Sequence, residues 1–116
     1  MTARFLEILF YILDNRRGRG FKNWSCYQIL EVLSKAYREK TLLLTRNAKT
    51  KSITGVVIAE LKDTNMHIHA ILGKPGMMKK FYNTFRLRWP AVETLTAERD
   101  DKAVTYKVET LDRRMK

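Results

Sequence analysis

The hydrophobic pattern of the chain changes within residues 66–85, MHIHAILGKPGMMKKFYNTF, and this change decides the fold. Residues 66–72 have the pattern of a strand, whose side chains alternate between two faces. From Met77 onward, apolar side chains recur every four residues, at Phe81 and Phe85, which is typical of a helix. The turn between the two patterns contains glycine and proline, which break regular structure. The stretch therefore predicts a strand, a glycine turn and a helix that ends before the next proline.

Two amphipathic helices are predicted on the N-terminal side of this stretch. Residues 4–14 place their apolar side chains on one helical face, and residues 25–39 do the same. The second helix has a capping box, in which Ser25 caps the first turn and Gln28 reaches back to it. Between the two helices, residues 16–24 contain two glycines and four positive charges, which indicates a loop.

Five strands are predicted, and short polar turns join the first three. The predicted strands cover residues 42–44, 53–61, 66–72, 92–98 and 103–110. Three strands joined by short turns form an antiparallel meander. The predicted fold is therefore α/β (α+β), with three helices packed on a mostly antiparallel mixed sheet of about five strands. The order is ααβββαββ, in one domain that spans residues 1–116.

The charge of the chain narrows the classes of partner. Of the 116 residues, 23 are Lys or Arg and 12 are Asp or Glu, which gives a net charge of +11. Such an excess favours polyanions: nucleic acid, an anionic membrane surface or phosphorylated ligands. The longest apolar run, residues 5–13, is too short to cross a bilayer, and Asp14 follows it where a signal peptide has small residues. Because Cys26 is the one cysteine, we expect a reducing compartment, such as the cytoplasm.

The glycine turn is the first candidate binding site. Gly73 and Gly76 let backbone amides approach a ligand, and the helix that follows presents unpaired N–H groups and a partial positive charge. Lys74, Lys79 and Lys80 add positive charge around the same turn. Lysine in the first turn of a helix is locally unfavourable, and an anion compensates for it. The alternative is an ordinary strand-to-helix turn with solvated lysines.

His67 and His69 are the candidate catalytic residues. They alternate on one strand and therefore project from the same face. Such a pair supplies a general base or two metal ligands, but no cysteine or carboxylate lies beside it at metal-ligand spacing, so we expect no metal. The alternative is a pair of ordinary, partly exposed strand histidines. Cys26, in the first turn of its helix, is a candidate nucleophile, but its position on the apolar face favours a buried structural cysteine.

The basic residues are unevenly distributed along the chain. No acidic residue lies between Thr64 and Val92, whereas acids gather from Glu93 to Asp101. This distribution predicts a positive surface on one side, which suits nucleic acid or another polyanion without base-specific contacts. The candidate residues for this anion patch are Arg16, Arg17, Arg19, Lys22, Arg86 and Arg88.

Three segments occur in an order that is known from one family. Phe21-Lys22-Asn23-Trp24 opens a helix, Leu43-Leu44-Thr45-Arg46 forms a strand, and the strand, glycine turn and helix end in Arg88-Trp89-Pro90. In this order, over about residues 21–107, the chain resembles the toxin-activating lysine acyltransferases, the haemolysin-activating family. The resemblance implies a fold of the N-acetyltransferase type and transfer of a fatty acyl group from acyl carrier protein to lysine. In the wider superfamily the glycine turn holds the pyrophosphate of coenzyme A, and residues 73–80 would be that turn.

The chain departs from this family at both catalytic positions. Phe21 stands where the family has its catalytic histidine, and His69 stands where the family has its catalytic aspartate. The chain is also short for the family. Small acetyltransferase-like proteins of this size are also encoded by tailed phages, some of them as virion-associated proteins. The inherited mechanism is therefore either lost or replaced by one that centres on His69.

Two functions follow from these observations. In the first, the chain is an acyl- or acetyltransferase-like protein, with acetyl-coenzyme A or acyl carrier protein as donor and His69 as the base. In the second, a non-catalytic structural or interaction protein of the same fold contacts protein or DNA, in the cytoplasm or in a phage particle. An open, V-shaped space between the strands that carry Leu61 and Leu95 would favour donor binding. Filling of that space by side chains would favour the structural role.

Overall fold

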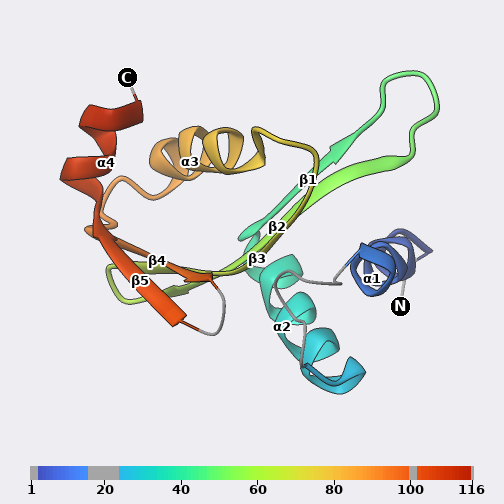
Figure 1. Cartoon of the computed structure of the whole chain (residues 1–116). Helices are drawn as coiled ribbons and strands as arrows, with labels where there is room; N and C mark the ends of the chain where they lie inside the picture. The colour runs from blue at the N-terminus through green and yellow to red at the C-terminus, as the bar shows by residue number, and fades with distance from the viewer. Residues whose placement is uncertain (1–2, 16–23, 100–101, 116) are drawn as a thin grey trace.

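Helices cover both faces of a central sheet in the computed structural model of the chain (Figure 1). The structure describes residues 3–15, 24–99 and 102–115. The helices α1, Ala3–Asn15, and α2, Cys26–Glu39, lie on one face of the sheet, and α3, Met77–Arg88, and α4, Val108–Met115, lie on the other. No helix among the described residues has the length and apolar character needed to cross a membrane.

The sheet contains five strands in the order β1-β2-β3-β4-β5. The strands are β1, Leu42–Arg46; β2, Ile53–Lys62; β3, Asn65–Gly73; β4, Thr94–Arg99; and β5, Lys102–Lys107. Neighbouring strands are antiparallel except β3 and β4, which are parallel because α3 forms the crossover between them. The prediction of a mostly antiparallel mixed sheet of about five strands is therefore confirmed.

The fourth helix corrects the predicted order, which has three helices and a strand over residues 103–110. In the structure β5 ends at Lys107 and α4 follows directly. Val108 and Leu111 bury their side chains against α3, because they lie three positions apart on one helical face. Glu109 in the first turn and Arg113 in the last complement the helix dipole and form an ion pair at 3.0 Å.

Two hydrophobic clusters hold the layers together. The cluster beneath α1 and α2 includes Ile12 and Ile29, which have no exposed surface. The cluster beneath α3 and α4 contains the predicted stripe of Met77, Phe81 and Phe85, all of them buried. Each fully buried side chain of this size contributes about 1.5–3 kcal/mol through the hydrophobic effect. The stripe therefore anchors α3, and with it the glycine turn, to the sheet.

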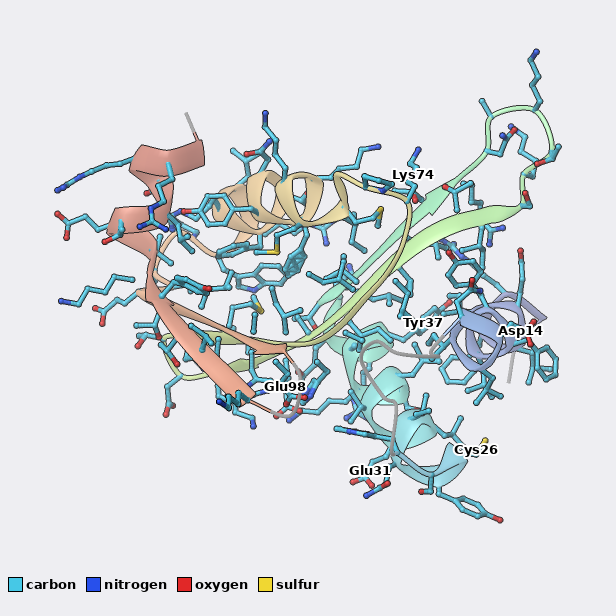
Figure 2. All side chains as sticks on the ribbon, in the orientation of Figure 1. Asp14, Cys26, Glu31, Tyr37, Lys74 and Glu98 are labelled. Carbon is cyan, nitrogen blue, oxygen red and sulfur yellow. The ribbon has the colours of Figure 1, made fainter. Side chains whose placement is uncertain are left out.

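Helix α2 begins with the predicted capping box, but Cys26 does not have the predicted burial. The Gln28 amide donates to the Ser25 hydroxyl at 3.2 Å, and the Ser25 amide donates to the Gln28 side chain at 2.8 Å. Cys26 is exposed, and Figure 2 shows it at the end of α2 that lies away from the sheet. The buried face of α2 begins one turn later, at Ile29. The prediction of a buried cysteine is therefore wrong.

Candidate functional site

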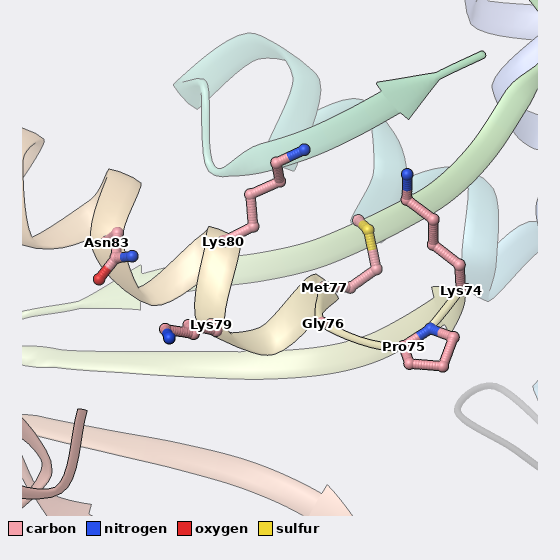
Figure 3. Close-up of a pocket in the computed structure, with 7 residues that line it drawn as sticks. All are labelled: Lys74, Pro75, Gly76, Met77, Lys79, Lys80 and Asn83. Carbon is pink, nitrogen blue, oxygen red and sulfur yellow. The ribbon is translucent and has the colours of Figure 1, made fainter. Parts of the chain in front are cut away.

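A cavity of about 270 Å³ lies at the N-terminal end of α3 (Figure 3). The residues that line this cavity, here called the lysine pocket, are Lys74, Pro75, Gly76, Met77, Lys79, Lys80 and Asn83. Four of the five residues that the sequence assigns to a donor site are among them. The fifth, Gly73, ends β3 directly before Lys74. The structure thus gathers the predicted binding residues around one hollow.

Both glycines of the turn adopt a left-handed backbone, with φ of 114° at Gly73 and 91° at Gly76. A Cβ on Gly73 would lie 2.4 Å from both the Cα of Gly55 and the carbonyl oxygen of Thr54. The Lys74 amide donates to that same carbonyl at 3.2 Å. Because the turn lies directly against β2, position 73 has no room for a side chain, and the backbone before α3 is fixed.

Among the residues that the structure describes, no acidic side chain compensates the N-terminus of α3. The N-cap residue is Gly76, which offers no side-chain hydrogen bond, and the first turn contains no acidic residue. Among the described residues, Lys74, Lys79 and Lys80 have no ion-pair partner. In Figure 3, Lys74 and Lys80 extend to the same side of the turn. Unpaired backbone N–H groups and unpaired lysines at one helix end favour a bound anion.

The candidate histidines lie on the opposite face of the sheet, where two carboxylates meet them. His67 Nε2 lies 2.7 Å from Glu98 Oε1, and the rings of His67 and His69 are 4.6 Å apart between centroids. His69 Nδ1 lies 3.9 Å from Glu98 Oε1, and its Nε2 lies 3.5 Å from Glu60 Oε1. These four residues are here called the His–Glu cluster. The prediction that both histidines project from one face is confirmed.

A β-bulge in β3 positions His69. In the register of β2 and β3, Ala59 pairs with Ile68 and Ile58 pairs with Ala70, so His69 has no partner across the strands. Before the bulge, Ile68 packs in the cluster beneath α3, and after it Ala70 packs in the cluster beneath α1 and α2. A bulge re-aims the side chains around it. This one changes the face to which the even-numbered residues of β3 belong.

His69 is buried, which corrects the alternative of a partly exposed strand histidine. The residue is 8% exposed, and the Trp24 ring packs against it in an edge-on arrangement at 5.7 Å. Neither ring nitrogen has a hydrogen-bond partner among the described residues. Burial lowers the pKa of His69 below its usual value, and the nearby His67 adds to this effect, whereas Glu98 and Glu60 oppose it.

Glu60 connects the cluster to α2. Burial acts to raise its pKa, but Lys35, with smaller contributions from Lys62 and His69, outweighs burial and holds the pKa below its usual value. The Lys35 ammonium lies 3.1 Å from Glu60 Oε2. Glu60 is therefore an ionised carboxylate at neutral pH, with one oxygen toward lysine and the other toward His69.

The sequence analysis missed both carboxylates of the cluster. Glu60 lies directly across from His67 in the antiparallel pair. Glu98 lies two residues beyond Thr96, the parallel partner of His67, and therefore on the same face. Only the strand register brings these residues together, and a correct register is the signal that could have found them. The premise for expecting no metal, that no carboxylate accompanies the histidines, is wrong.

Of the predicted anion patch, the structure describes two residues, Arg86 and Arg88. Arg86 forms an ion pair with Asp112 at 3.1 Å and donates to the Pro90 carbonyl at 3.3 Å. Arg88 donates to the Lys40 carbonyl at 3.3 Å. These two arginines therefore hold loops and helix ends together. The remaining patch residues, and the family's substituted position, lie outside the described residues: Arg16, Arg17, Arg19, Lys22 and Phe21.

The space between Leu61 and Leu95 is not a cleft. Leu61 pairs with Met66, and Met66 pairs with Leu95, so β3 occupies the space between the two strands. The strands separate elsewhere, because the parallel pairing of β3 and β4 ends at Ile68 and Ala97. Beyond this point β4 pairs with β5 alone. The space between these two strands therefore does not distinguish a donor-binding protein from a structural protein.

Comparisons with protein-family models, with curated proteins and with solved structures found no match for this chain. The resemblance to the lysine acyltransferases therefore stays a prediction. A functional proposal has to rest on the lysine pocket and the His–Glu cluster.

Proposed function

We propose that the chain is an acyltransferase-like protein that binds a phosphate-bearing acyl donor, of the coenzyme A or acyl carrier protein type, in the lysine pocket. One observation carries the proposal: a cavity coincides with an uncapped helix N-terminus and with three lysines that have no ion-pair partner among the described residues. Phosphate oxygens accept hydrogen bonds from lysine and from backbone N–H groups, and such charge-assisted bonds are the strong ones.

The size of the pocket limits what it holds. At about 270 Å³ it lies just below the range of about 300–1,000 Å³ that is usual for drug-sized ligands. The pocket therefore suits the phosphate groups of a donor, and the acyl end lies outside it. His69 lies on the opposite face of the sheet from the pocket, on β3 four residues before Gly73 and at the point where β3 and β4 separate, so the acyl end of a donor would have to pass this point to reach it. We predict that any acyl transfer depends on His69, with His67 beside it.

A second candidate is a non-catalytic binding protein of the same fold. The burial of His69 favours it, because a side chain that is 9% exposed and lies between two carboxylates offers a substrate little access. With a net charge of +11, such a protein would bind DNA without sequence preference. The affinity for DNA should then fall steeply between low and moderate salt. An affinity that hardly changes with salt, or that depends strongly on DNA sequence, contradicts this candidate.

Calorimetric titration with coenzyme A and acetyl-coenzyme A tests the first proposal. We expect saturable binding to the wild type and a loss of roughly one to a few kcal/mol in the double variant Lys79→Glu/Lys80→Glu, because charge-assisted hydrogen bonds are lost. The matched control is Lys49→Glu/Lys102→Glu, which makes the same charge change on exposed residues away from the pocket. That control should bind like the wild type at moderate salt.

Two outcomes would remove the donor-binding proposal. The first is no affinity for either ligand in the wild type. The second is an equal loss in both double variants, which would show a general charge effect without a site. If the donors bind but no acyl group is transferred to an amine, the non-catalytic function is the correct one.

A further inference from the structure

We infer that the His–Glu cluster is a binding site for a divalent transition-metal ion, with His67, His69 and Glu98 as its ligands. One ligand atom from each of the three residues lies within 4.8 Å of the other two. Two imidazoles and one carboxylate are a set that binds Zn²⁺, and three protein ligands leave a fourth position open for water or a substrate atom. The site is separate from the lysine pocket and does not depend on the donor proposal.

The distances fit a small ion. Bonds of about 2.0–2.2 Å from Zn²⁺ to nitrogen and oxygen place the ligand atoms of a tetrahedral site about 3.4 Å apart. From Glu98 Oε1 the distance is 2.7 Å to His67 Nε2 and 3.9 Å to His69 Nδ1, values on either side of this spacing. The third pair of ligand atoms, on His67 and His69, lies within 4.8 Å. Side-chain rotations that bring the more distant atoms closer would place all three around one ion.

The second nitrogen of His69 supports the same assignment. A metal-bound histidine usually donates its other ring N–H to a carboxylate, which fixes the orientation of the ring. His69 Nε2 lies 3.5 Å from Glu60 Oε1, and Lys35 holds the other oxygen of Glu60 at 3.1 Å. His69 Nδ1 is then free to face the ion. Glu60 is the positioning residue of this site.

A metal-free hydrogen-bond network does not account for His69. The bond between His67 Nε2 and Glu98 Oε1 gives each of those residues a partner. It leaves the two nitrogens of the buried His69 without a hydrogen-bond partner among the described residues. Buried polar atoms are nearly always paired in native proteins. A bound ion would supply a partner to Nδ1, and Nε2 already lies 3.5 Å from Glu60 Oε1.

The strands that carry the ligands make the site rigid. His67 and His69 lie on β3, the central strand of the sheet, and Glu98 lies on its parallel neighbour β4. Because His67 and His69 are two residues apart on one strand, their side chains lie beside each other on the face toward α2, with the ring centroids 4.6 Å apart. Sites built on regular strands hold ligand geometry better than sites built on loops.

The test is a Zn²⁺ titration of the chelator-treated full chain without a histidine tag, followed by calorimetry and, with Co²⁺, by visible absorption. We expect one ion per chain. His67→Gln and Glu98→Gln should each weaken binding by about tenfold or more, since each removes one ligand. Glu109→Gln, an exposed carboxylate on α4, is the control and should bind like the wild type.

The absence of saturable binding by the wild type overturns the inference. So does an affinity that both His67→Gln and Glu98→Gln retain, because it would show adventitious binding elsewhere. Glu98 is 35% exposed, so its substitution should leave the fold intact, and circular dichroism verifies this point. Coenzyme A affinity, measured on the same variants, should not change, which separates a failure of this site from a failure of the donor proposal.

Discussion

The lysine pocket and the His–Glu cluster lie on opposite faces of the same sheet and are incomplete in opposite ways. Figure 2 shows Lys74 beside α3 and Glu98 on the side of α2. In the pocket, positive groups gather, and none of the described residues that line it is acidic. In the cluster, carboxylates are present, and two imidazole nitrogens have no hydrogen-bond partner among the described residues. The first arrangement favours an anion and the second a cation, although the chain as a whole has a charge of +11.

One strand connects the two regions. β3 carries His67 and His69 in its middle and ends at Gly73, from which the lysine pocket begins. The bulge at His69 shifts the alternation of side chains between the cluster residues and the end of the strand. Substitutions in β3 should therefore disturb both regions, whereas substitutions in the helical layers should disturb one.

The largest effect is expected from Gly73→Val. The new side chain would lie within 2.4 Å of two backbone atoms of β2, at a φ of 114° that valine rarely adopts. We expect the free energy of unfolding to fall by about 3 kcal/mol or more, because neither strand can move away from the sheet. Urea unfolding measures the loss, and titrations with coenzyme A and Zn²⁺ should show that both ligands bind more weakly.

Gly76→Ala is the control within the same turn. A Cβ at Gly76 meets no atom within 4 Å, and only its φ of 91° is unfavourable. The expected cost is about 1–2 kcal/mol, from the left-handed backbone alone. An equal cost for Gly73→Val and Gly76→Ala would show that the close contact of the turn with β2 does not matter.

Tyr82→Phe should affect only the face of the sheet that is covered by α3 and α4. The Tyr82 hydroxyl donates to the Asp112 carboxylate and also lies 3.2 Å from the Val108 carbonyl oxygen. Burial and the Asp112 charge raise the pKa of Tyr82 to about 12. Loss of the hydrogen bond to Asp112 should cost about 1–2 kcal/mol at neutral pH. Zn²⁺ affinity should stay the same, since the His–Glu cluster lies on the opposite face of the sheet.

The raised pKa also gives a dependence on pH. The neutral phenol is the form that the fold stabilises, so its contribution is complete below pH 10, the pKa of unfolded tyrosine, and is lost as the pH rises toward 12. The wild type should therefore lose more stability than Tyr82→Phe between about pH 8 and about pH 11. Equal losses in the two proteins would mean that burial and Asp112 on α4 do not raise the pKa of Tyr82.

The smallest effect is expected from Cys26→Ala. Because Cys26 is exposed, its substitution should change the free energy of unfolding by less than about 0.5 kcal/mol. It should also leave any acyl transfer intact, whereas His69→Ala should remove most of it. A transfer activity that requires the thiol and tolerates His69→Ala would reverse the ranking of the two candidates.

Local patterns predicted much of the fold but little of the cluster. The capping box at Ser25, the apolar stripe of α3 and the glycine turn depend on neighbours in sequence, and the structure contains all three. The His–Glu cluster depends on the register of three strands, and short sequence patterns do not predict strand register. The bulge at His69 depends on how β2 pairs with β3, and the exposure of Cys26 depends on how far α2 extends beyond the sheet. Neither can be read from neighbouring residues in the sequence. The amphipathic pattern of α4 is present in the sequence, but no turn residue separates it from β5, so the predicted strand runs on into the helix.

The central claim is that the two faces bind different ligands independently. Amide chemical shifts, recorded by NMR during separate titrations with coenzyme A and Zn²⁺, test it most directly. Coenzyme A should shift the amides from Lys74 to Lys80 and leave those of His67 and Glu98 unchanged, and Zn²⁺ should do the reverse. Shifts of one common set of amides by both ligands, or shifts in neither region, would contradict the account.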